Sequence, residues 1–205
     1  VVPDAAAKFA LTASEKSQDT RAAVAGIPGE PEHWFFTDAG ADPDTWVAPD
    51  IDTNSPAAIQ YTSGSTRSPK GVLLSHGNIL HNCDAIRQSW NGDENAKGVF
   101  WLPPHHDLGL IGGILSMIYV GASTALMSPT AFIKRPMRWL ELVSAHRGVI
   151  TAAPNFAYDR CVETSTPEER AALDLSCMTV AMNGAESVRA TSLAAFADAF
   201  APAGF

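Results

Sequence analysis

The sequence predicts an α/β protein with a mainly parallel sheet that helices cover on both faces. Two observations lead to this prediction. From residue 57 onward, short apolar runs alternate with segments that have helical spacing of apolar residues. The short runs are also apolar throughout, as is typical of strands buried on both faces of a parallel sheet.

The expected strands share this apolar character and end at glycine, proline or polar turns. They are residues 34–36, 57–61, 72–74, 98–102, 123–127, 148–153 and 177–182. The expected helices show three- and four-residue apolar spacing or a recognisable cap. They are residues 5–25, 76–90, 108–119, 136–146, 156–163 and 190–200, with Thr166 to Glu169 as a further capping box. Residues 39–56 are rich in Asp, Pro and Asn, which predicts a loop.

Composition narrows the class of protein. The chain has 205 residues, of which 46% are hydrophobic and 18% charged, so a folded globular domain is expected. A net charge of −8 without a Lys or Arg cluster argues against nucleic-acid binding. Three widely spaced cysteines form no CxxC pair, so we expect no structural metal site and a reduced, cytoplasmic setting. Residues 108–120 are too short to span a bilayer, which takes ~20 apolar residues.

The ends of the chain suggest a fragment. It starts without methionine and stops directly after a helical pattern. A fragment exposes surfaces that its parent buries, which favours association, for example as a homodimer.

A loop rich in hydroxyl groups lies between the expected strands 57–61 and 72–74. Its candidate phosphate-binding residues are Thr62, Ser63, Gly64, Ser65, Thr66, Arg67 and Lys70. Backbone N–H groups, short hydroxyls and a cation suit a polyphosphate. The Walker A spacing fails, because Pro69 stands where the second glycine belongs and a strand rather than a helix follows. From composition alone, an ordinary polar turn remains open.

Two further segments follow expected strands. His105, His106 and Asp107 come after strand 98–102. A metal site, an acyltransferase motif or a turn without a functional role can be considered there. Adjacent histidines converge poorly on a metal, and Leu110 stands where the acyltransferase motif needs Asp. Residues 183–186, Asn-Gly-Ala-Glu, lie at the carboxyl end of a strand, where open α/β sheets bind ligands. A plain turn remains open there too.

Together these motifs resemble the adenylate-forming superfamily. Residues 61–72 are similar to its [YF]TSGSTGxPKGV phosphate loop, and Arg67, in place of Gly, resembles the fatty acyl-AMP ligase branch. Residues 101–110 are similar to PLxHDxGL, with His105 in the aromatic position. Residues 183–188 resemble NGAEPV, with Ser187 in place of Pro. Residues 128–140 and 153–158 look like the SPxxFxxRPxxWL and GPNFAY runs of that branch.

The resemblance implies an activity and its residues. A fatty acid and ATP, with Mg2+, would give acyl-AMP, and an acyl carrier protein would accept the acyl group, alone or in a polyketide or peptide assembly line. Lys70 and His106 would be catalytic. Residues 62–67 would hold phosphates, and Asn183, Gly184, Ala185 and Glu186 would hold adenine. No metal ligand is assigned, since the main magnesium ligand is expected outside the fragment.

The resemblance also implies an organisation. Residues 1–56 would be an N-terminal helix and loop-rich linker, and residues 57–205 the ATP- and acyl-binding part of a truncated N-terminal domain. We expect this fragment alone to be incomplete and inactive. An acyl-CoA synthetase fragment and a non-catalytic nucleotide- or acyl-binding module remain as alternatives.

Overall fold

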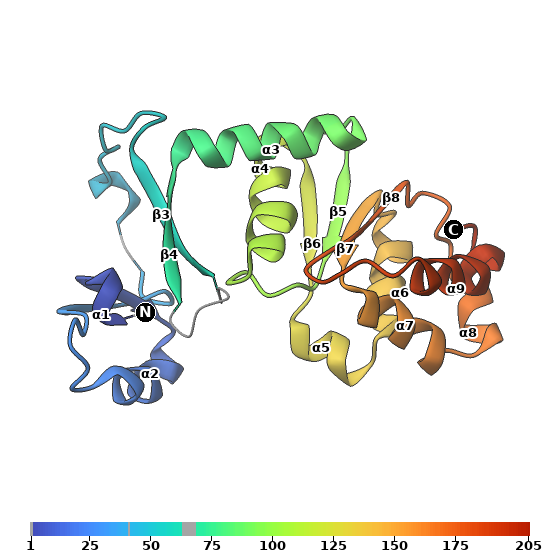
Figure 1. The fold of residues 1–205 in the computed structure, drawn as a ribbon, viewed down its shortest axis with the longest axis horizontal. Coiled ribbons are helices and arrows are strands. Elements are labelled where there is room, and N and C mark those ends of the chain that lie inside the picture. The colour runs from blue at the N-terminus through green and yellow to red at the C-terminus, as the bar shows by residue number, and fades with distance from the viewer. Residues whose placement is uncertain (1, 41, 63–68) are drawn as a thin grey trace. The chain divides into compact units, whose positions relative to one another are not determined.

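The computed structural model describes residues 2–40, 42–62 and 69–205. The chain divides into two compact units, residues 1–78 and 79–205. Helix α3 (His76–Trp90) begins in the first unit and continues in the second. Its start is capped as predicted, because Ser75 Oγ accepts a hydrogen bond from the backbone N–H of Asn78 at 3.2 Å. Figure 1 labels the elements.

The first unit contains two small sheets. Strands β1 (Phe9–Thr12) and β2 (His33–Phe36) pair in parallel, and β3 (Pro56–Thr62) and β4 (Lys70–Ser75) pair antiparallel. Its helical segments are α1 (Val2–Ala5), η1 (Ser14–Lys16), α2 (Ser17–Val24) and η2 (Pro43–Thr45).

The single helix predicted for residues 5–25 is wrong, because β1 occupies part of that range. Pairing with β2 overrides the local helical pattern, and the Phe9 ring stacks on His33 across the two strands at 5.3 Å. The other strands of this unit were predicted to within a few residues.

The second unit contains a four-stranded parallel sheet in the order β6-β5-β7-β8. The strands are β5 (Lys97–Phe100), β6 (Ser123–Leu126), β7 (Ile150–Ala153) and β8 (Val180–Asn183). The helices are η3 (Leu108–Leu115), α4 (Ser116–Val120), α5 (Pro129–Lys134), α6 (Met137–His146), α7 (Asn155–Thr164), α8 (Pro167–Ala171), α9 (Ala190–Phe200) and η4 (Ala201–Ala203). The mainly parallel α/β fold is confirmed.

Three details of this unit differ from the sequence prediction. The helix expected at 108–119 is a π-helix, η3, that continues as α4. Helix α5 was missed, although Ser128 caps it by accepting a hydrogen bond from the Ala131 N–H. The strand expected from residue 177 starts only at Val180, because the Met178 N–H donates to the carbonyl of Leu175 in a turn.

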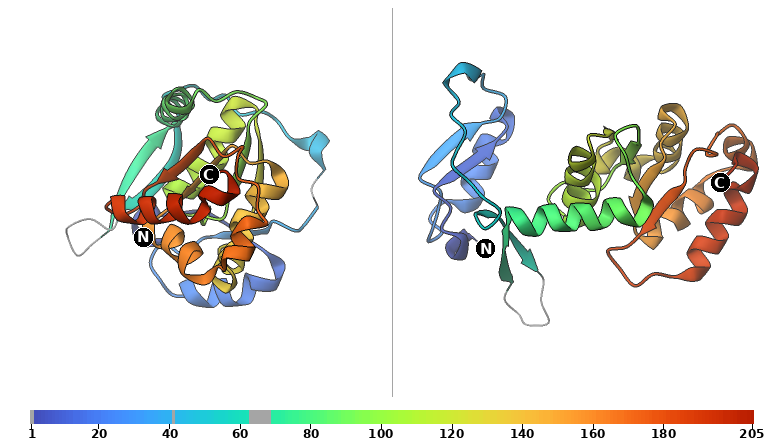
Figure 2. Two further views of the ribbon diagram at one scale, coloured as in Figure 1. Left: turned by 90° about the vertical axis from the view of Figure 1, so that its right-hand side faces the viewer. Right: turned by 90° about the horizontal axis from the view of Figure 1, so that it is seen from above.

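Helices cover both faces of this sheet, as predicted. Val99 and Trp101 face one core, which Trp139 of α6, Tyr158 of α7 and Phe196 of α9 complete. A second core on the opposite face holds Phe100 and Ile150 of the sheet with Met117 of α4. Figures 1 and 2 show α4 on one side of the sheet and α6, α7 and α9 on the other. Among the described residues, no helix combines the length and apolar character that a bilayer span needs.

The strand order reverses between β5 and β7. From β5 the chain passes through η3 and α4 to β6 on one side, and then returns to β7 on the other side of β5. The segments that leave the carboxyl ends of β5 and β7 therefore run to opposite faces of the sheet. Open α/β sheets bind ligands in the crevice that such a reversal creates.

Candidate functional site

The phosphate-loop residues that the structure describes lie at the loop end of the β3–β4 hairpin. Thr62 and Lys70 face each other as the last pair of the antiparallel register, and both are exposed. The predicted arrangement, two strands joined at this loop, is thus confirmed. The predicted positions Ser63, Gly64, Ser65, Thr66 and Arg67 lie outside the described residues. Phosphate binding by this loop stays a prediction.

Gly71 allows an aromatic ring to lie against the hairpin next to Lys70. A Cβ built on Gly71 would lie 3.0 Å from Ile59 Cγ2 and 3.2 Å from Tyr61 Cε1. A larger side chain would therefore push against the ring opposite, so glycine fits the close packing here.

His106 is held by its neighbours in the turn after β5. Its Nδ1 lies 2.7 Å from Asp107 Oδ1, and the Leu108 N–H donates to the same Oδ1 at 2.7 Å. The same Leu108 N–H is shared with the imidazole, because Nδ1 also accepts from it at 3.2 Å. With Nδ1 as an acceptor, the proton of the neutral ring lies on Nε2.

Asp107 also caps the π-helix η3 that starts at Leu108. The turn and helix are packed closely, because a Cβ on Gly109 would lie 2.2 Å from the carbonyl oxygen of Pro103. The backbone N–H of His106 donates to that same oxygen at 3.1 Å. Glycine at position 109 therefore fixes the helix against the turn that carries His106. π-Helical segments, most of them single turns, are frequent at functional sites, and η3 is a longer example of eight residues.

The predicted adenine segment forms a turn at the carboxyl end of β8. Asn183 is the last residue of the strand, and the Gly184 N–H donates to the carbonyl of Ala153, at the end of β7, at 3.3 Å. Among the described residues, a Cβ on Gly184 would come within 4 Å of Leu108 Cδ2 alone, at 3.8 Å. The structure thus brings this turn next to the start of η3, two residues after His106. Both segments lie at the carboxyl edge of one sheet.

Ala185 in this turn has a left-handed backbone with φ of 68°. This conformation costs a non-glycine residue about 1–2 kcal/mol and persists only where other contacts hold it. Glu186 supplies one weak contact, since the Phe156 N–H of α7 lies 3.4 Å from its Oε1.

Helix α7 supplies the stronger contacts. The Tyr158 hydroxyl donates to the carbonyl of Met182 at 2.7 Å. Burial, with a smaller effect of the Cys161 thiol, raises the pKa of Tyr158 above its usual range, so this hydroxyl keeps its proton. Asn155 contacts the same turn. The sequence placed Asn155 only within the GPNFAY-like run, which the resemblance implies helps to line an acyl tunnel, and gave it no role of its own. A polar amide at the start of a helix, two residues after a buried strand, was the signal that could have marked it.

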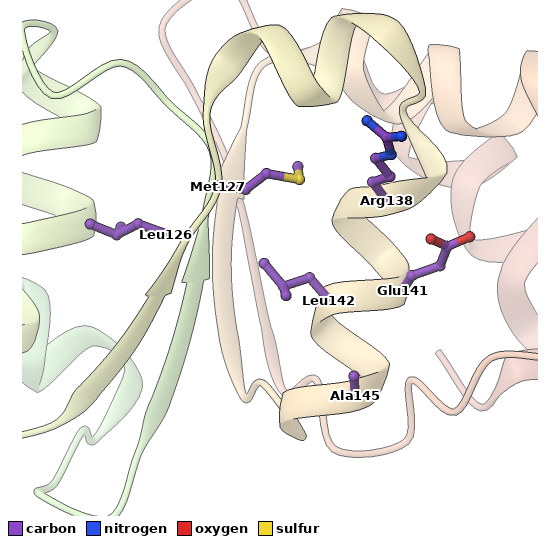
Figure 3. A pocket seen from close by; sticks show the side chains of 6 residues that line it. All are labelled: Leu126, Met127, Arg138, Glu141, Leu142 and Ala145. Carbon is purple, nitrogen blue, oxygen red and sulfur yellow. The ribbon is translucent and has the colours of Figure 1, made fainter.

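A pocket of about 410 Å3 lies elsewhere in the second unit, between edge strand β6 and α6. Figure 3 shows Met127 and Leu142 pointing toward each other there. The residues that line it are Leu126, Met127, Arg138, Glu141, Leu142 and Ala145. The lining includes no residue of the His106 turn or of the Asn183–Glu186 turn, and none of these six residues was predicted as a site residue.

Comparison with known proteins assigns the family. A family model described as AMP-binding enzyme matches residues 1–204. The chain belongs to the AMP-binding enzyme family. Among its relatives is the medium-chain-fatty-acid–[acyl-carrier-protein] ligase JamA of Moorena producens, which is 39% identical over 98% of this chain and 35% of the relative. The 4-hydroxyphenylalkanoate adenylyltransferase of Mycobacterium tuberculosis is 42% identical over 72% of this chain and 24% of the relative.

Comparison with solved structures supports the same family. The fatty acyl-adenylate ligase from L. pneumophila, solved with acyl adenylate and pyrophosphate, has a TM-score of 0.85 and 36% identity over 97% of this chain and 34% of that one. These matches confirm the resemblance to fatty acyl-AMP ligases that the motifs predicted. This AMP-binding enzyme chain spans 24% to 35% of the length of these relatives.

Proposed function

We propose that the full-length protein activates a fatty acid carboxylate with ATP to give acyl-AMP and pyrophosphate, and then passes the acyl group to an acyl carrier protein. The observation that carries this proposal is the meeting of two turns at the carboxyl edge of the parallel sheet. The turn of His106 follows β5, the turn of Asn183 to Glu186 follows β8, and Leu108 and Gly184 bring them together.

The second turn offers a surface that suits adenine. Gly184 leaves the backbone open on one side, so that a flat base can lie against it. Asn183 also has a buried side-chain oxygen, Oδ1, without a hydrogen-bond partner among the described residues. Such an oxygen costs about 1–3 kcal/mol until a donor satisfies it. The exocyclic amino group of adenine is a donor of the right kind. Asn183, Gly184, Ala185 and Glu186 are therefore proposed to hold the base.

His106 is proposed to act on the carboxylate and the α-phosphate. Asp107 and the Leu108 N–H hold the ring in place, while Nε2–H remains to donate toward the reacting oxygens. The carboxylate oxygen attacks the α-phosphorus and pyrophosphate leaves. Lys70 and Thr62, at the end of the hairpin, would bind the phosphates by charge and hydroxyl contacts.

Magnesium is the second group that this chemistry implies. The described residues bring together no group of three or more His, Cys, Asp or Glu side chains that could hold a metal. The described part of the chain does not fit a magnesium site of its own, so no step is derived through the ion.

The proposal that an acyl carrier protein accepts the acyl group is supported by the relatives. JamA and TtuA of Teredinibacter turnerae are both described as medium-chain-fatty-acid–[acyl-carrier-protein] ligases, which supports a fatty acid as substrate and a carrier protein as acceptor. Self-association of residues 1–205 through surfaces that the longer protein buries is a further proposal, which the mass of this segment in solution tests. A cytoplasmic location is another, which cell fractionation tests.

The test is pyrophosphate release by the full-length protein with laurate and ATP, followed by acyl transfer to a holo-acyl carrier protein or to CoA. We expect laurate-dependent release, transfer to the carrier protein, and a loss of about 100-fold in rate for His106→Ala, as for other groups that stabilise transition-state charge. The matched control is the exposed His81→Ala on α3. Transfer to CoA alone would support an acyl-CoA synthetase, and binding of ATP without release would support a non-catalytic module.

A further inference from the structure

Asn155 is a fully buried amide that joins the start of α7 to the turn after β8. Its Nδ2 donates to the carbonyl of Ser187 at 2.9 Å. Its Oδ1 accepts from the backbone N–H of Arg189 at 2.8 Å and from Asn183 Nδ2 at 2.9 Å. One side chain thus contacts the first residue of the turn and two residues beyond it.

The polarity of this network is fixed by the backbone. A carbonyl can only accept and an N–H can only donate, so Ser187 and Arg189 allow the Asn155 amide a single orientation. Its oxygen therefore faces Asn183, which must donate to it through its own NH2 group. The Asn183 Oδ1 is left as an acceptor, and the usual ambiguity of an amide flip does not arise at either residue.

An oxygen held in this orientation discriminates between purines. An acceptor attracts the 6-amino group of adenine and repels the 6-oxo group of guanine. The Asn183 oxygen is covered in the structure, so a base has to displace part of that cover to reach it. If Asn155 were removed, the Asn183 amide could rotate by half a turn and present its NH2 group instead.

We propose that Asn155 is a positioning residue that fixes the Asn183–Glu186 turn for the nucleotide and, by orienting the Asn183 amide, favours adenine over guanine. This inference rests on the proposed function. It also explains how Ala185 keeps its left-handed backbone, because residues on both sides of Ala185 are tied to one rigid amide.

The test compares Asn155→Ala, Asn155→Asp and Thr151→Val in the full-length protein. Thr151 is the matched control: it is equally buried, accepts from Trp139 Nε1 at 2.8 Å and donates to the carbonyl of Val99 at 2.6 Å, on the face of the sheet away from η3. The measurements are KM for ATP and for laurate, the ratio of kcat/KM for ATP to that for GTP, and the melting temperature.

For Asn155→Ala we expect KM for ATP to rise about tenfold, the size of one to two lost net hydrogen bonds, with KM for laurate changing less than about threefold. The ATP to GTP ratio should fall by a similar factor. Asn155→Asp keeps the oxygen that faces Asn183, so its ratio should stay near that of wild type while KM for ATP rises, because its second oxygen meets the Ser187 carbonyl. Thr151→Val should lower the melting temperature and leave KM for ATP and the ATP to GTP ratio unchanged.

Several outcomes would overturn the inference. An unchanged ATP to GTP ratio in Asn155→Ala would remove the selectivity role, and an unchanged KM for ATP would remove the positioning role, while wild-type activity still upheld the proposed function. Equal effects in Thr151→Val would show that loss of stability explains the result. If Asn155→Ala does not fold, Asn155→Asp is compared with Asn183→Ala, which removes the Asn183 amide. Equal ratios of kcat/KM for ATP to that for GTP in these two variants would contradict the inference. A wild-type protein that forms no acyl-AMP refutes the proposed function and this inference with it.

Discussion

Gly109→Ala tests whether the packing of η3 against the turn of His106 matters for activity. The added Cβ would lie 2.2 Å from the Pro103 carbonyl oxygen, whereas real Cβ contacts essentially never fall below 3.0 Å. Helix and turn must therefore separate by at least about 0.8 Å, the difference of these two distances. The obstacle is backbone rather than a flexible side chain, so the strain cannot be relieved by a rotamer change.

The expected effects have different sizes on stability and on rate. Overpacking of this kind costs about 1–3 kcal/mol, which leaves a domain of typical stability folded. A misplacement of ~1 Å at a reacting group can cost about 100-fold in rate. Because the Pro103 oxygen also accepts the His106 N–H, the displacement reaches that residue directly. We expect a loss of about 100-fold in kcat for laurate-dependent pyrophosphate release, with a lower melting temperature.

Gly112→Ala is the control for this experiment. It adds the same methyl group to the same helix, at another buried glycine, but the nearest atom is the Leu108 Cδ1 at 3.2 Å, at the end of a flexible side chain. We expect near-normal kcat. A Gly109→Ala variant as active as wild type, or equal losses in both variants, would refute the argument that this close contact positions His106.

Two further predictions concern stability and reactivity. Thr166→Ala removes a complete capping box at the start of α8 and should cost about 0.5–2 kcal/mol, measured as a lower midpoint in urea; an unchanged midpoint would show that the box contributes nothing. Burial raises the pKa of the Cys161 thiol to about 12, so at pH 8 it stays protonated, and iodoacetamide should modify the partly exposed Cys177 first. Mass spectrometry that finds Cys161 modified first in the folded protein contradicts this.

Local patterns predicted the second unit well and the first unit less well. Strands β5 to β7 each overlap a short, mainly apolar run that is visible without knowledge of its partners, and the capping box at Thr166 is a contact within four residues. The segment at 5–25 failed because its strand exists only through pairing with β2, more than twenty residues away along the chain. A single sequence carries no direct signal for such pairing.

The sequence by itself determined the α/β class, the hairpin that ends at Thr62 and Lys70, and the family to which the motifs belong, because each of these rests on residues close together along the chain. Only the tertiary structure decided that the turns of His106 and Gly184 meet, and that Asn155 fixes the amide of Asn183. Those contacts join segments 28 or more residues apart, and they follow from the strand order β6-β5-β7-β8, which no local pattern encodes.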